Sequence, residues 1–252
     1  AGSLNGSNQG GTDIFLAKYD DDGALQWVKQ TGTASDDAAY AIAIDGSDNI
    51  FITGHSEGAL GGTSSGERDI VVMKWNSSGT LQWTKQFGSD QDDYARGITV
   101  DGSDNLIVSG YSFGDFASTN QGSSDLVLLK LDNSGSLVWQ KQLGSDKKDM
   151  AKSVVVGTAD CIYIGGLTEG SLNCKYNRGF SDVLLVKYDS DGAWQWTEQY
   201  GSVGLDYGKS LIIDGSDNLL FSGWTNGNID GNFSSGNNDL LVFKYDQNGV
   251  RK

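Results

Sequence analysis

DIFLAKYD at residues 13–20 has four close copies further along this 252-residue chain. The copies are DIVVMKWN at 69–76, DLVLLKLD at 125–132, DVLLVKYD at 182–189 and DLLVFKYD at 239–246. Successive copies start 56, 56, 57 and 57 residues apart. A fixed period of this size is the sequence signature of a repeat architecture, in which each unit packs on its neighbours. We therefore expect residues 1–252 to form one domain, with repeats starting near 13, 69, 125 and 182 and a partial fifth at 239.

Each repeat predicts four short strands. The octapeptide is apolar almost throughout, which is typical of a strand buried on both faces. An Asp/Asn-x-x-Gly turn follows it and leads to a second strand such as LQW at 81–83. A third strand such as GITVD at 97–101, a GSDN turn and a fourth strand such as LIVSG at 106–110 complete the unit. Four antiparallel strands per repeat indicate the blades of an all-β propeller.

The segments DIFLAKYDDDGALQW at 13–27 and AIAIDGSDNIFITG at 41–54, with their counterparts in each copy, resemble a known family. It is the bacterial and archaeal β-propeller repeat family, named after a predicted seven-bladed form. The resemblance covers nearly the whole chain. It implies a propeller in a secreted or surface-exposed protein, and it implies no enzymatic activity. This chain carries only about four and a half copies, too few for seven blades.

Four blades are the simplest closed ring for this number of strands. The blade begun by strands within 209–223 would be completed by strands within 13–31, which places a seam between the two ends of the chain. Strands 13–20 and 239–246 then compete for one position. The surplus strand 239–246 could pair or exchange with a second copy, because an unpaired strand edge is a template for another chain. We therefore expect a homo-oligomer.

Composition argues against several classes of function. The net charge is −15 and the 18 Lys and Arg residues are scattered, so no basic patch for nucleic acid is visible. No apolar run approaches the roughly 20 residues of a membrane span, so we expect no membrane insertion. The chain begins directly in polar repeat sequence, without a visible signal peptide.

Candidate chemistry is sparse. The single histidine, His55, and two cysteines cannot supply a four-ligand zinc site or a plausible catalytic triad. Cys161 and Cys174 are either free thiols or one disulfide. The GSDN turns lack the terminal Glu of a twelve-residue calcium loop. We expect no enzyme and no cofactor, with calcium among the acidic loops as the remaining alternative.

Residues that recur in every copy favour a structural role. Four tryptophans recur in register, and packing between neighbouring blades is favoured over stacking on sugars. Four aspartates precede the third strands, and capping of a loop is favoured over binding a cation. These two sets are Trp27, Trp83, Trp139 and Trp196, and Asp37, Asp93, Asp149 and Asp206.

The segment after each fourth strand is the best candidate for a binding site. It keeps the frame Ser/Thr-x-Gly, while the position before the frame changes among His55, Tyr111, Leu167 and Trp224. Variable side chains on a rigid frame are typical of ligand pockets, and neutral variation at half-exposed positions is the alternative. The candidate ligand-binding residues are His55, Glu57, Tyr111, Phe113, Glu169, Trp224 and Asn226.

Two functions fit these observations. The first is a multivalent, lectin-like protein that binds glycans or a surface polysaccharide outside the cell or on its surface. Repeated shallow sites would raise the avidity of weak single sites. The second is a structural or self-assembling scaffold of the cell surface or extracellular space, joined through the surplus strand.

Overall fold

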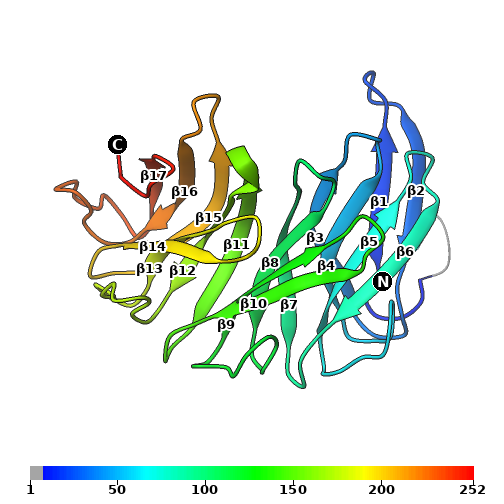
Figure 1. Cartoon of the computed structure of the whole chain (residues 1–252), viewed down its shortest axis with the longest axis horizontal. Coiled ribbons are helices and arrows are strands. Elements are labelled where there is room, and N and C mark those ends of the chain that lie inside the picture. The colour runs from blue at the N-terminus through cyan, green and yellow to red at the C-terminus, as the bar shows by residue number, and fades with distance from the viewer. Residues whose placement is uncertain (1–7) are drawn as a thin grey trace.

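Antiparallel strands build the part of the chain that the structure, a computed structural model, describes: residues 8–252. They form five sheets that fan out side by side along an arc (Figure 1). Three of the sheets are complete, with four strands each. Their strands are β3 (Asp37–Ile44), β4 (Ile50–Ser56), β5 (Asp69–Trp75) and β6 (Leu81–Phe87); β7 (Asp93–Val100), β8 (Leu106–Ser112), β9 (Asp125–Leu131) and β10 (Leu137–Leu143); and β11 (Asp149–Val156), β12 (Ile162–Thr168), β13 (Asp182–Tyr188) and β14 (Trp194–Tyr200).

Two incomplete sheets lie at opposite ends of the arc (Figure 1). One contains β1 (Ile14–Tyr19) and β2 (Leu25–Thr31), and the other contains β15 (Asp206–Ile213), β16 (Leu219–Thr225) and β17 (Asp239–Tyr245). The all-β fold of four-stranded antiparallel sheets is confirmed. The predicted seam is not formed, because β1 pairs with β2 and β17 pairs with β16. β17 follows β16 directly in the chain and has the sequence pattern of β1. It therefore pairs with the edge of β16 that was predicted to pair with β1.

The recurring Lys and Trp residues tie each sheet to a turn of the next. The Trp83 Nε1–H donates to the carbonyl oxygen of Asn133 at 3.3 Å, and Lys74 Nζ donates to the same oxygen at 3.4 Å. Two complete sheets further on, Trp196 and Lys187 both donate to the carbonyl oxygen of Gln247, each at 3.2 Å. The structural interpretation of the recurring tryptophans is thereby confirmed.

The recurring aspartates also hold the framework. The Asp93 Oδ2 accepts the backbone N–H of Ser89 at 2.6 Å, so this aspartate fastens the loop between two sheets. The Asp69 Oδ2 accepts a 2.8 Å hydrogen bond from the Gln86 side chain. Asp93 is the first residue of β7 and is buried. The third strands therefore begin at these aspartates, a few residues earlier than the sequence predicted.

Four sheets begin with a strand that contains a β-bulge. These strands are β3, β7, β11 and β15, and we call them the inner strands. In β7, Ala95 pairs with Gly110 and Gly97 pairs with Ser109, so Arg96 is left out of the ladder. A Cβ atom on Gly110 would lie 1.8 Å from the carbonyl oxygen of Tyr94, which explains why glycine is required opposite the bulge. The residues left out of the ladder in this way are Tyr40, Arg96, Lys152 and Lys209.

Candidate functional site

The variable positions lie inside strands rather than in the loops after them. His55, Tyr111, Leu167 and Trp224 belong to β4, β8, β12 and β16, which corrects the prediction that they follow the fourth strand. Each is paired with the residue after the recurring aspartate of the inner strand. The pairs are Ala38–His55, Tyr94–Tyr111, Met150–Leu167 and Tyr207–Trp224, and we call these four pairs the inner belt.

A cavity of about 510 Å³ lies at the inner belt between the sheets β3–β6 and β7–β10. Its apolar wall consists of aromatic side chains, and its polar wall consists of charged ones. The aromatic residues are Tyr40, His55, Tyr94, Tyr111 and Phe113. The charged residues are Asp36, Glu57, Arg68, Asp92 and Arg96. Four of the sequence-predicted residues, His55, Glu57, Tyr111 and Phe113, therefore meet in one place.

The aromatic rings pack on one another in a continuous row. The His55 ring stacks on Tyr40 at 5.6 Å and meets Tyr94 edge-on at 5.0 Å. Tyr94 stacks on Tyr111 at 5.1 Å, and Phe113 meets Tyr111 edge-on at 5.9 Å. Such offset and edge-to-face arrangements are the favoured geometries of aromatic pairs. The rings are therefore held in place by contacts with one another.

Exposure separates the rings that a ligand can reach from those that support them. His55 is 7% exposed and Tyr111 is 5% exposed, whereas Tyr40 is 46% and Phe113 36% exposed. Burial, followed by the neighbouring charges of Arg68 and Arg96, lowers the pKa of His55, so its imidazole is neutral at pH 7. His55 and Tyr111 are thus buried and contact the more exposed rings of Tyr40 and Phe113, respectively.

Arg68 organises the polar wall. Its guanidinium forms ion pairs with Glu57 at 2.5 Å and with Asp92 at 3.1 Å. It also donates a 2.9 Å hydrogen bond to the hydroxyl of Tyr94. The carboxylates keep further acceptor lone pairs, and donors and acceptors therefore alternate along this wall. The wall can contact a ligand that carries several hydroxyl groups.

The remaining predicted residues lie on other sheets. Trp224 stacks on Tyr207 at 4.4 Å, with the ring planes 10° apart. Asn226 accepts the backbone N–H of Leu205 at 2.6 Å, so its side chain holds a loop. Glu169 is half-buried and follows β12 directly. These three residues are therefore not part of the cavity at His55.

Sequence reasoning missed Tyr40, Tyr94, Arg68 and Arg96. A signal for three of them was present, because the positions one and three residues after the recurring aspartate vary between copies. The first reads Ala, Tyr, Met, Tyr, and the second reads Tyr, Arg, Lys, Lys. Arg68 had no such signal, since it reaches the site from the loop that precedes β5.

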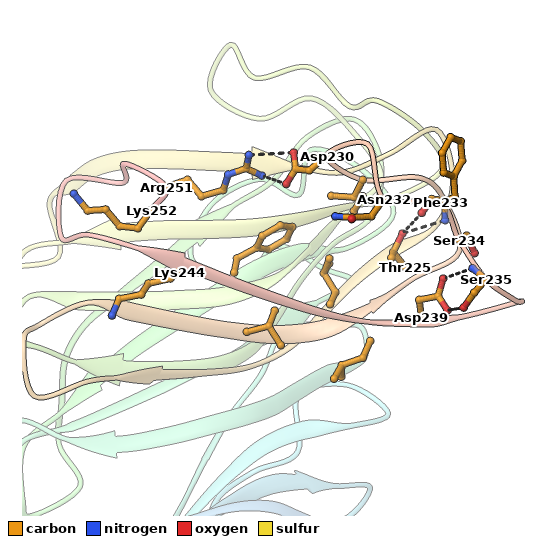
Figure 2. Close-up of a pocket in the computed structure, with 16 residues that line it drawn as sticks. Thr225, Asp230, Asn232, Phe233, Ser234, Ser235, Asp239, Lys244, Arg251 and Lys252 are labelled. Atoms are coloured by element: carbon orange, nitrogen blue, oxygen red, sulfur yellow. Dashed lines mark hydrogen bonds and ion pairs between the residues drawn. The ribbon is translucent and has the colours of Figure 1, made fainter.

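A second cavity, of about 550 Å³, lies beside the last sheet (Figure 2). In Figure 2 the ion pair between Arg251 and Asp230 crosses one end of it, with an N–O distance of 2.6 Å. Leu240 and Phe243 of β17 also line it. In a complete sheet a fourth strand covers this edge, and none of the strands within residues 8–252 does so here. This cavity therefore marks the unfilled edge of the last sheet.

Residues 8–252 hold little other candidate chemistry. No three His, Cys, Asp or Glu side chains come together there as a metal site would require. Cys161 and Cys174 are free thiols, which answers the question of a disulfide. The same residues contain no helix with the length and apolar character needed to span a membrane.

Comparison with known proteins places two segments in a repeat family. Residues 26–62 and 82–117 match the family described as the β-propeller repeat. The chain is 21% identical over 222 residues to the regulatory protein FlaEY of Caulobacter vibrioides, covering 79% of this chain and 22% of that protein. It is 23% identical to an uncharacterized WD repeat-containing protein of Acanthamoeba polyphaga mimivirus, covering 99% of this chain and 18% of that protein. The chain thus spans about a fifth of the length of these curated relatives.

Similar solved structures include a gluconolactonase from Xanthomonas campestris, with a TM-score of 0.47 and 12% identity, covering 81% of this chain and 61% of that one. They also include a xylan β-1,4-xylosidase from Bacillus halodurans, with a TM-score of 0.44 and 11% identity, covering 96% of this chain and 52% of that one. Both are enzymes. The prediction that this chain is not an enzyme is corrected accordingly.

The resemblance stated from the sequence is confirmed by the two matched segments. The sheets observed in the structure agree with it, since both segments run from a second strand through the third and fourth strands of a repeat. The chain therefore carries β-propeller repeats, arranged as five antiparallel sheets.

Proposed function

We propose that this chain is a binding scaffold whose ligand is a glycan or a surface polysaccharide. The observation that carries the proposal is the cavity at the inner belt, which is lined by partly exposed aromatic side chains together with hydrogen-bonding groups. The apolar face of a pyranose stacks on an aromatic ring, while its hydroxyls need donors and acceptors on the other side. Tyr40 and Phe113 supply the exposed aromatic side chains, and Glu57, Arg68 and Asp92 supply the polar groups.

A second aromatic pair, in the last sheet, also supports a glycan ligand. The Tyr207–Trp224 stack occupies the position in the last sheet that Tyr94–Tyr111 occupies in a complete one. Two weak sites on one scaffold bind a polymer more tightly than either site alone, because the second contact is intramolecular. An extracellular or cell-surface location belongs to this proposal, since that is where such polymers are met.

A glycan array with and without EDTA tests the proposal. We expect neutral or acidic oligosaccharides to bind, and binding that survives EDTA to weaken in Tyr40→Ala and Phe113→Ala. Both side chains are partly exposed, so their removal leaves the sheets intact. Tyr176→Ala is the matched control, because Tyr176 is exposed and lies outside the inner belt. Absence of binding to every glycan at millimolar concentration would overturn the proposal, and binding lost only in EDTA would reassign the site to calcium.

Self-assembly is the second candidate. Among residues 8–252, no strand pairs with the outer edge of β17, which makes only an isolated bridge from Tyr245 to Arg251, and Leu240 and Val242 on this strand are exposed. An exposed apolar edge can pair with the same edge of a second copy, which gives a symmetric dimer. Light scattering tests this candidate. We expect an oligomer that disappears when residues 239–252 are deleted, and a monomeric parent chain would refute it.

A further inference from the structure

The inner strands present a row of positive charges. The bulge residues of β7, β11 and β15 are Arg96, Lys152 and Lys209, and the equivalent residue of β3 is Tyr40. The four inner strands contact one another in sequence, β3 with β7, β7 with β11 and β11 with β15. A bulge residue is free of the ladder and can point its side chain to the inner face. We call Arg96, Lys152 and Lys209 the cation row.

Within the described part of the chain, no cation of this row forms an ion pair with a carboxylate. Among residues 8–252, ion pairs within 4.0 Å involve other cations, namely Arg68, Lys130, Lys175, Lys244, Arg251 and Lys252. In that part of the chain Arg96, Lys152 and Lys209 have none. The Arg96 Nε is also buried without a hydrogen-bond partner. The chain as a whole has 33 acidic and 18 basic residues, so three neighbouring cations form a local positive patch on an acidic protein.

The charges of the row act on one another. Burial is the largest cause that lowers the pKa of Lys152 to about 8, followed by the positive charges of Arg96, Lys209 and Lys148. Like charges on a partly buried surface repel, and an anion placed among them removes this cost. A positive track on an acidic protein also attracts an anion locally, while the rest of the surface repels it.

Aromatic rings alternate with the cations. The Arg96 guanidinium lies 3.9 Å from the ring centroid of Tyr40 and donates to the Tyr111 hydroxyl at 2.9 Å. The Lys152 ammonium lies 4.8 Å from the centroid of Tyr111, and that of Lys209 lies 5.6 Å from the centroid of Tyr207. Each cation thus has a ring beside it. This alternation fits a polymer whose units carry both an apolar sugar face and an anionic group.

We propose that the ligand of the inner belt is an acidic polysaccharide, whose carboxylate or sulfate groups bind Arg96, Lys152 and Lys209 in turn. This inference rests on the proposed function for its sugar component and adds the charge of the ligand. Guanidinium and ammonium groups both donate charge-assisted hydrogen bonds to such anions. Neutral glycans would use only the aromatic half of the same surface.

Binding of four polymers of matched length to the whole chain tests the inference: polygalacturonate, dextran sulfate, neutral dextran and polyglutamate. We expect polygalacturonate or dextran sulfate to bind more tightly than neutral dextran. Added salt should weaken that binding. Preference for dextran sulfate over polygalacturonate would assign the anion as sulfate, and the reverse preference as carboxylate. Equal binding of neutral dextran would overturn the acidic ligand and leave the proposed function standing. Equal binding of polyglutamate would keep the cation row as an anion site and overturn the sugar. Absence of binding by all four would overturn the acidic ligand, whereas the glycan array decides the proposed function.

Two charge-removing variants locate the site. Lys152→Gln and Lys209→Gln are each expected to weaken binding of the acidic polymer by about tenfold, the usual loss for one charge-assisted contact. Lys147→Gln is the matched control, because Lys147 is an exposed lysine on a loop outside the row. Lys209 is itself exposed, so its replacement does not endanger folding. An equal effect of all three variants would show attraction by net charge alone and refute the row as the site.

Discussion

Strands β9 and β17 carry the same sequence pattern, DLVLLKL and DLLVFKY, yet their environments differ sharply. Leu126 of β9 is fully buried, whereas Leu240 at the same repeat position of β17 is 82% exposed. The difference arises because β9 lies between β8 and β10, while β17 is an edge strand with no sheet packed beyond it. The comparison teaches that the neighbouring strand, and not the strand's own residues, determines how much of this motif is buried.

At the other end of the arc, exposure again depends on the neighbouring strands. Ile98 in β7 is 7% exposed, and Ile42 at the same position of β3 is 56% exposed. The inner strand β7 packs on the inner strand β3, but the sheet before β3 consists only of β1 and β2 and has no inner strand. Both ends of the arc therefore expose apolar side chains that the middle sheets bury.

The largest effect expected from this comparison is on stability. Leu126→Ala should lower the free energy of unfolding by about 2 to 5 kcal/mol, because it leaves a cavity in a packed core. Leu240→Ala removes the same atoms from an exposed site and should change it by less than about 0.5 kcal/mol. Urea denaturation of the two variants measures the difference. Equal losses would mean that β17 is buried in solution, which would favour assembly through its edge.

A second prediction concerns a feature that the two kinds of sheet share. Gly110 and Gly223 both face an inner-strand bulge, and a Cβ atom on either would lie 1.8 Å from a backbone carbonyl oxygen. Alanine at each should cost about 1 to 3 kcal/mol through overpacking. Gly46→Ala is the control, since its Cβ would meet no atom within 4 Å. A large cost at Gly110 with none at Gly223 would indicate that the bulge is lost in the incomplete sheet.

The smallest effect is a difference in titration between equivalent carboxyl groups. Burial raises the pKa of Asp182 at the start of β13, whereas hydrogen bonds from Ser235 and Ser234 lower the pKa of Asp239 at the start of β17. The folded chain therefore binds a proton at Asp182 more tightly than the unfolded chain does, and this contribution to stability grows as the pH falls. The contribution of Asp239 has the opposite sign and is lost as the pH falls. NMR titration of both carboxyl carbons should give a higher midpoint for Asp182, and the reverse order would contradict the burial pattern.

The sequence predicted the repeat, the strand pattern and the structural role of residues such as Trp83 and Asp93, because these depend on local periodicity and on recurrence. It failed at the ring closure. β1 and β17 have the same pattern, so sequence alone cannot decide which of them pairs with β16. Four of the twelve residues that line the cavity at His55 were found from variation between copies. Arg68 was not, because its place depends on how the loop before β5 folds back, which no periodic pattern encodes.

The inner-strand bulge has a consequence for how such a protein can be altered. Its residue takes no part in the ladder, so its identity can change while every backbone hydrogen bond of the sheet stays the same. Each inner strand therefore holds one position, the bulge residue, that can be substituted without changing the strand pairing around it. In this chain the four bulge residues are Tyr40, Arg96, Lys152 and Lys209. Substituting these four residues, one in each inner strand, offers a direct way to design ligand selectivity on an unchanged scaffold.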